Sequence, residues 1–194
     1  MRIDYQFIEK HVPRGARVLD LGCGDGALLE ELGQKRDVEG IGIEIDEQSV
    51  QQCISRGIPV YHGDMLESCS MFDDKSFDFV ILSQTLQQSL DPVRVIEEML
   101  RIGHKCIISF PNFGHWPVRL KLLFTGRMPV TENFPYSWYE SPNVNLLTIN
   151  DFVSFCKERN LKIVDRVFFT TGFYRPPSFA ANLLAASAVF VLED

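Results

Sequence analysis

The stretch Val18-Leu19-Asp20-Leu21-Gly22-Cys23-Gly24-Asp25-Gly26-Ala27-Leu28 joins an apolar strand, a glycine-rich turn and the start of a helix. Glycine lets the chain reverse tightly and lets a ligand approach backbone atoms closely. The first turn of the helix offers N–H groups that no helical carbonyl accepts. The stretch therefore predicts a ligand-binding turn after the first strand of an α/β sheet.

Apolar strand-type segments alternate with helix-type segments on both sides of this turn. Such alternation is typical of a parallel sheet that helices cover on both faces. The connection over residues 170–186 is too short for a helical crossover of normal size, so the last two strands should be antiparallel. We expect seven strands, mostly parallel, with one antiparallel strand at the edge. The strands are predicted at 17–21, 38–43, 59–61, 77–82, 106–110, 162–169 and 187–192, and the helices at 3–11, 27–32, 47–55, 92–101 and 150–159.

Length, composition and charge restrict the class of protein. The chain has 194 residues, of which 45% are hydrophobic and 23% charged. These values are typical of a globular protein that needs no disulfide or metal to fold, and we expect residues 1–194 to form one domain. The formal net charge is −7. Because an acidic chain is not drawn to phosphate backbones, we expect no nucleic-acid partner.

Cysteine usage and hydropathy indicate a cytoplasmic protein. The five cysteines are odd in number and form no CxxC pair, which is typical of a reducing compartment. Residues 1–6 include an acid and lack the apolar run of a signal peptide. The most apolar stretch, residues 180–192, is too short to span a bilayer. We therefore expect no membrane association.

Three acidic residues fall where predicted strands end. Asp20 ends the first strand, Glu44 follows the second and Asp64 follows the third. Ligands of open α/β sheets bind at the carboxyl ends of the strands, so we expect the three carboxylates to share one pocket. Glu44 suits two ribose hydroxyls. Asp64 suits an adenine amino group, with Met65 packed on the ring.

Two classes of ligand fit the glycine turn. Gly22, Gly24 and Ala27 match the dinucleotide spacing G-x-G-x-x-G/A, which is a weak signal by itself. Asp20 favours a different class, because a carboxylate repels a pyrophosphate but attracts a sulfonium and an ammonium group. S-adenosylmethionine carries both cations. We therefore expect S-adenosylmethionine, or its product S-adenosylhomocysteine, rather than a dinucleotide.

Simpler roles stay open for several of these residues. Asp64 by itself is more typical of a turn or a helix cap. Asp46 competes with Glu44 for the ribose, and we favour Glu44 because the apolar run of the strand ends there. Cys23 is more typical of a small buried residue than of a reactive thiol. The four histidines lack metal-ligand spacing, so no metal site is expected.

The motifs resemble known proteins at two levels, a broad superfamily and a narrower family. Residues 15–110 resemble class I S-adenosylmethionine-dependent methyltransferases. Three later stretches are similar to the family of the methionine-biosynthesis protein MetW, and that match extends over nearly the whole chain. The resemblance implies a Rossmann-like class I methyltransferase fold whose role is to support a homoserine O-acyltransferase of the MetX type. The stretches are Phe79-Val80-Ile81-Leu82-Ser83-Gln84-Thr85-Leu86-Gln87, Ser109-Phe110-Pro111-Asn112-Phe113-Gly114-His115-Trp116 and Phe134-Pro135-Tyr136-Ser137-Trp138-Tyr139-Glu140-Ser141-Pro142-Asn143.

A recognisable catalytic motif is missing where a methyl acceptor should bind. Methyl transfer often needs a base for the proton of the acceptor, and residues 83–88 after the fourth strand contain no titratable group. We therefore expect an accessory subunit with unknown catalytic residues, and keep a small-molecule methyltransferase as the alternative. The resemblance implies that the cofactor residues are Asp20, Gly22, Cys23, Gly24, Glu44, Ile45, Asp64, Met65, Ser83 and Gln84.

The aromatic-rich segment, residues 111–147, departs from the alternating pattern. It contains seven aromatic residues, including both tryptophans, and its helix-type run 116–124 carries Arg119 and Lys121. A lid over the cofactor and a docking surface both fit this composition. Trp, Tyr and Arg are favoured anchors of protein interfaces. Together with the resemblance, this favours docking on the acyltransferase.

Overall fold

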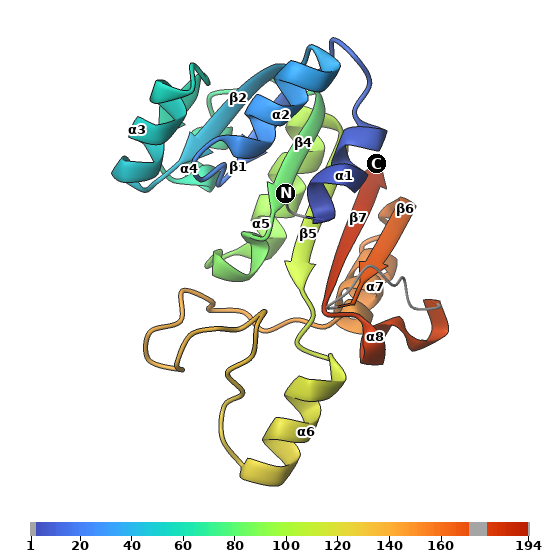
Figure 1. The fold of residues 1–194 in the computed structure, drawn as a ribbon. Coiled ribbons are helices and arrows are strands. Elements are labelled where there is room, and N and C mark those ends of the chain that lie inside the picture. Colours follow the sequence, from blue (N-terminus) through green and yellow to red (C-terminus); the bar gives the residue numbers. More distant parts are fainter. Residues whose placement is uncertain (1–2, 171–177, 194) are drawn as a thin grey trace.

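Seven strands form one sheet in the order β3-β2-β1-β4-β5-β7-β6 in the computed structural model, which describes residues 3–170 and 178–193 (Figure 1). Strands β1 to β5 pair in parallel, whereas β7 is antiparallel to both of its neighbours, β5 and β6. The predicted mostly parallel sheet is confirmed, and its antiparallel strand lies next to the outermost strand, β6. The strands are β1 (Arg17–Leu21), β2 (Glu39–Glu44), β3 (Val60–His62), β4 (Phe77–Ser83), β5 (Gly103–Pro111), β6 (Lys162–Phe169) and β7 (Ser187–Glu193).

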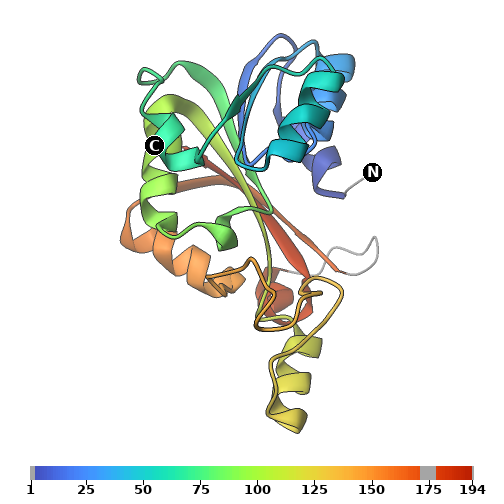
Figure 2. The same ribbon diagram turned by 90° about the vertical axis from the view of Figure 1, so that its left-hand side faces the viewer.

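Helices cover both faces of the sheet, as the two views show (Figures 1 and 2). Helices α1, α2 and α3 pack on one face, and α4, α5 and α7 pack on the other. The α-helices are α1 (Ile3–His11), α2 (Ala27–Arg36), α3 (Glu47–Ser55), α4 (Met65–Cys69), α5 (Pro92–Ile102), α6 (Trp116–Thr125), α7 (Ile149–Glu158) and α8 (Ala181–Leu184), and two 3₁₀ turns are η1 (Leu86–Gln88) and η2 (Ser178–Ala180).

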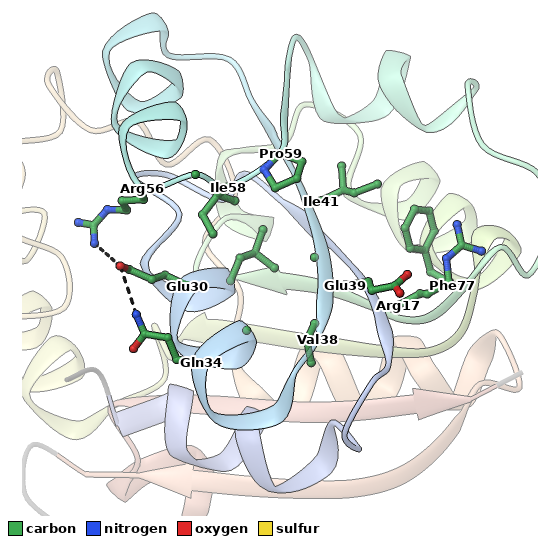
Figure 3. Close-up of a pocket in the computed structure, with 14 residues that line it drawn as sticks. Arg17, Glu30, Gln34, Val38, Glu39, Ile41, Arg56, Ile58, Pro59 and Phe77 are labelled. Carbon is green, nitrogen blue, oxygen red and sulfur yellow. Dashed lines mark hydrogen bonds and ion pairs between the residues drawn. The ribbon is translucent and has the colours of Figure 1, made fainter.

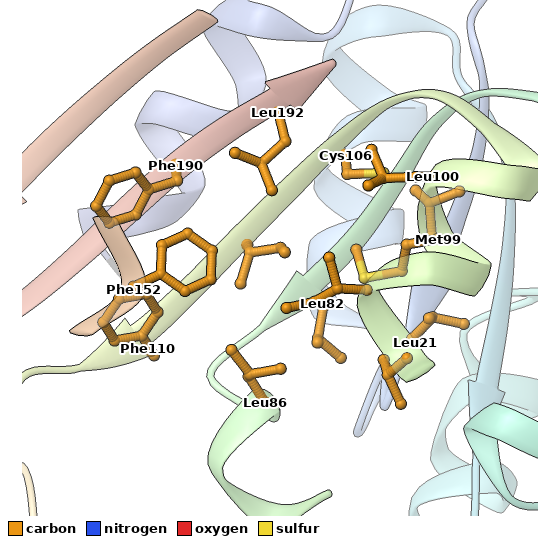
Figure 4. Close-up of a cluster of buried hydrophobic side chains, with 14 of the residues drawn as sticks. Leu21, Leu82, Leu86, Met99, Leu100, Cys106, Phe110, Phe152, Phe190 and Leu192 are labelled. Atoms are coloured by element: carbon orange, nitrogen blue, oxygen red, sulfur yellow. The ribbon is translucent and has the colours of Figure 1, made fainter. Parts of the chain in front are cut away.

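Alternation along the strands divides the core into two clusters. Successive side chains of a strand point to opposite faces of the sheet. In β1, Leu19 and Leu21 belong to the cluster under α5 and α7, whereas Val18 belongs to the cluster under α1 and α2. Figure 4 shows the first cluster, where the Phe190 ring lies 4.7 Å from that of Phe152 and 5.8 Å from that of Phe110. The strands are apolar on both faces because both faces are covered.

The aromatic-rich segment leaves the carboxyl end of β5 and extends away from the sheet (Figures 1 and 2). Val118 and Phe134 are buried, and the Phe134 ring contacts that of Phe113 edge-on at 5.3 Å. Most of its other large apolar side chains face solvent. The exposed ones are Trp116, Leu120, Leu122, Leu123, Phe124, Met128, Val130, Tyr136, Trp138, Tyr139, Val144 and Leu146. No helix among the described residues is both long enough and apolar enough to span a membrane.

Candidate functional site

A cavity of about 390 Å³ opens at the carboxyl ends of β1, β2 and β4 and at the turn after β3. The sheet order changes direction at this place, since β2 lies on one side of β1 and β4 on the other. Open α/β sheets bind ligands at such a switch point. The lining residues are Gly22, Gly24, Ile43, Glu44, Ile45, Gly63, Asp64, Met65, Ser83, Gln84, Thr85 and Gln88.

The glycine turn forms one wall of this cavity. Gly22, Gly24 and Gly26 have φ angles of 67°, 56° and 76°, in the left-handed region that favours glycine. A Cβ at position 22 would lie 2.7 Å from the Cγ2 atom of Thr85. The loop after β4 thus packs directly against the turn, and no larger residue fits between them.

Glu44 contacts the glycine turn from the end of β2. It is 8% exposed, and three backbone N–H groups donate to it: that of Gly24 at 2.8 Å, that of Ile45 at 2.8 Å and that of Asp46 at 2.9 Å. The competing acid, Asp46, accepts instead from the Ser49 N–H at 2.8 Å and caps α3. That bond lowers the pKa of Asp46. The structure therefore directs Glu44 to the cavity and Asp46 to a helix start.

Asp64 and Met65, after β3, also line the cavity. The Oδ1 atom of Asp64 accepts from the N–H groups of Leu66 at 2.8 Å and Glu67 at 3.1 Å. Asp64 is thus the N-cap of α4, the simpler of its two expected roles. It also lines the cavity, so the cap and a ligand contact are compatible.

The end of β4 also lines the cavity, through Ser83. Ser83 donates from Oγ to the Asp4 carboxylate at 3.0 Å, and the Ser109 hydroxyl donates to the same oxygen at 3.3 Å. Asp4 comes from α1 and is 5% exposed. Sequence reasoning missed this carboxylate because 79 positions separate it from Ser83 and no local pattern marks the contact.

Two of the ten predicted cofactor residues are not among the residues that line the cavity: Asp20 and Cys23. Asp20 is 2% exposed. The Cys23 thiol lies 3.8 Å from that of Cys53 in the core under α2 and α3, and burial raises its pKa well above the ordinary range. A contact of either residue with a cofactor stays a prediction. The other eight meet in one cavity, to which the structure adds Ile43, Gly63, Thr85 and Gln88.

A second, larger cavity of about 550 Å³ lies at the other end of the sheet (Figure 3). It is lined by the first residues of three strands, Arg17, Glu39 and Phe77, and by Arg56, which pairs with Glu30 at 2.5 Å. This is the amino end of the parallel strands, where open α/β sheets do not hold their ligands. We therefore take the smaller cavity as the candidate site.

Comparisons with known proteins are consistent with the fold and the motifs. A family model described as "Methionine biosynthesis protein MetW" matches residues 2–192. The chain is 34% identical over 204 residues to the bifunctional methionine biosynthesis protein MetXA/MetW of Rhodopirellula baltica, and the match covers 100% of this chain and 33% of that protein. It is 28% identical over 150 residues to the demethylmenaquinone methyltransferase of Listeria welshimeri, covering 66% of this chain and 63% of that one. The chain thus spans a third of the first relative and less than two thirds of the second.

Solved structures share the whole fold. A S-adenosylmethionine-dependent methyltransferase of Thermotoga maritima, described as a possible histamine N-methyltransferase, matches with a TM-score of 0.69 over 98% of this chain and 86% of that one. The two sequences are 16% identical, so the likeness concerns the fold alone. This chain has the class I methyltransferase fold predicted from its sequence.

Proposed function

The chain belongs to the family of the methionine biosynthesis protein MetW, and we propose that it binds S-adenosylmethionine or S-adenosylhomocysteine and acts as the activating partner of a homoserine O-acyltransferase of the MetX type. The observation that carries the partner role is the Rhodopirellula protein, whose name joins MetXA and MetW in one chain. Joining two modules holds them at a high effective concentration. Such a fusion is expected where the modules act together.

The cavity supports the ligand in size and chemistry. Its volume of about 390 Å³ lies within the roughly 300–1,000 Å³ of small-molecule sites. Glu44 would accept from the ribose hydroxyls, and Asp64 and Met65 would hold the adenine. The glycine turn provides a surface without side chains, which lets the amino-acid part of the ligand approach the backbone. When bound, S-adenosylmethionine would supply an activated methyl group.

The aromatic-rich segment supports docking rather than a lid. Trp138 and Tyr139 are 76% and 70% exposed, and Phe124 is 79% exposed. None of these three residues lines the cavity. A lid would place its rings over the ligand, whereas an interface would present them to solvent in the free chain, as exposed aromatics rimmed by polar residues do.

An acyl-transfer assay tests this function. The acyltransferase is expressed with and without this chain, and acyl transfer to homoserine is measured for each. We expect a higher rate, and co-purification of the two proteins, when the chain is present. Equal rates without co-purification would overturn the partner role.

One observation favours a second candidate, a small-molecule methyltransferase. The relative from Listeria is a demethylmenaquinone methyltransferase, and 66% of this chain is similar to it. Transfer of a labelled methyl group from S-adenosylmethionine into a metabolite extract would support this alternative.

A further inference from the structure

Loop 84–89, which is part of the connection between β4 and α5, has one side in the cavity and the other on the aromatic-rich segment. Gln84, Thr85 and Gln88 line the cavity. On the other side, the Gln87 carbonyl accepts from the N–H groups of Val144 at 2.9 Å and Asn145 at 3.0 Å. One short loop therefore contacts both proposed sites.

Side chains strengthen this connection. The Nδ2 atom of Asn145 donates to the Ser89 carbonyl at 2.6 Å. Within the loop, Nε2 of Gln87 donates to the Gln84 carbonyl at 2.7 Å, and Gln87 is 4% exposed. Residues 144–145 and the loop thus move together, because separating them would break three hydrogen bonds.

The loop also contacts β5 and the glycine turn. Gln84 has a φ of 60°, which is costly for a residue with a side chain. Its N–H donates to the Ser109 carbonyl at 2.9 Å. The neighbouring Thr85 fits closely on Gly22 of the glycine turn. A ligand in the cavity, which Gln84, Thr85 and Gln88 line, would therefore touch the element that holds residues 144–145.

We propose that loop 84–89 couples the cavity to the aromatic-rich segment, so that S-adenosylhomocysteine in the cavity strengthens binding of the acyltransferase. The inference rests on the proposed function. Ligand contacts restrict the loop, the loop restricts residues 144–145, and the ordered segment then loses less conformational entropy when it docks. Coupling is reciprocal, so the acyltransferase raises the affinity for S-adenosylhomocysteine by the same factor.

Hydrogen exchange on the chain alone tests the first half of the proposal. The backbone amides of Val144 and Asn145 should exchange more slowly when S-adenosylhomocysteine is present. The second half needs the acyltransferase. Its affinity for this chain should rise at least fivefold with saturating S-adenosylhomocysteine, within the usual range of coupling between two sites.

A matched pair of variants isolates the connection. Asn145→Ala removes the bond to the Ser89 carbonyl, whereas Asn133→Ala removes a bond to the Ala186 carbonyl from the same segment, away from the loop. The ratio of acyltransferase affinities with and without S-adenosylhomocysteine should fall to below twofold in Asn145→Ala. It should keep the wild-type value in Asn133→Ala.

The outcomes separate this inference from the proposed function. If S-adenosylhomocysteine binds and the acyltransferase binds, but neither amide exchange nor the affinity ratio changes, the coupling is overturned and the function stands. Equal ratios in the two variants would likewise exclude the loop as the connection. If the wild-type chain binds no S-adenosylhomocysteine, the cofactor assignment fails and this inference fails with it.

Discussion

Truncation of Trp138 and Tyr139 is the most direct test of the docking surface. The two rings meet edge-on with centroids 5.5 Å apart, and both side chains are more than two-thirds exposed. In the free chain they bury little area, and their mutual contact contributes about 0.5–1.5 kcal/mol. The double variant Trp138→Ala/Tyr139→Ala should therefore fold, with a thermal midpoint close to that of the wild type.

The expected effect on docking is much larger. An aromatic side chain buries roughly 150–250 Å², and the exposed share of both rings is available to a partner. At about 25 cal/mol per Å², burying this area is worth several kcal/mol as an upper estimate. Interface aromatics cost about 2 kcal/mol or more on truncation, but two rings in contact are not additive. We expect the affinity for the acyltransferase to fall between about thirtyfold and a thousandfold.

Calorimetry with the acyltransferase and with S-adenosylhomocysteine measures both properties of the double variant. Affinity for the acyltransferase should fall by this factor, while affinity for S-adenosylhomocysteine stays within about twofold. Phe179→Ala is the control, since Phe179 is a 93% exposed aromatic outside the segment. The reasoning is refuted if the double variant keeps its docking affinity. A lid would give the reverse pattern, with weaker ligand binding and intact docking.

Three further expectations concern the cavity and the core. Glu44→Ala should weaken S-adenosylhomocysteine binding by about 1.5–3 kcal/mol in calorimetry, because charge-assisted hydrogen bonds are lost. The control Glu47→Ala, on the exposed start of α3, should leave this binding unchanged. Gly22→Ala should lower the free energy of unfolding in urea by about 2–4 kcal/mol, because it combines a left-handed φ with an overlap at 2.7 Å. Gly57→Ala, with a similar φ and open space, should cost only about 1 kcal/mol. Burial raises the pKa of Cys69 from 9.0 to about 12. The thiol therefore ionises at a lower pH in the unfolded chain than in the folded chain, and the stability that Cys69 contributes is lost as the pH rises from about 9 towards 12. Cys69→Ala should flatten that decline in urea titrations.

The sheet and most of the cavity follow from local patterns. Apolar strands, the glycine turn and acids at strand ends are all visible within a few residues, and they place eight of the predicted residues around one cavity. Thr85 and Gln88 were missed because a polar run before a helix resembles an ordinary helix start. Their place depends on how closely the loop approaches Gly22, which is a property of the packed sheet.

Contacts between distant elements could not be predicted in this way. Asp4 reaches Ser83 only because α1 packs against the sheet near the end of β4. Asp20 and Cys23 were predicted from the motif, but side chains alternate along a strand. Asp20 shares the face of Val18, under α1 and α2, and the Cys23 thiol fills space over Gly42. The packed structure thus shows which residues of the motif line the cavity, and a contact of Asp20 or Cys23 with a cofactor stays a prediction.

The carboxylates separate the two functional hypotheses chemically. Among the residues that line the cavity, the acids are Glu44 and Asp64, and backbone N–H groups already engage both. Asp64 accepts both of its N–H groups at one oxygen, Oδ1, which caps α4. Asp4 is not among the lining residues, and it accepts from the hydroxyls of Ser83 and Ser109. The proposed partner role needs no base in the cavity, because it rests on ligand binding and on the exposed apolar surface. Acyl transfer and methyl transfer, measured with the same preparation of this chain, therefore decide between the two hypotheses.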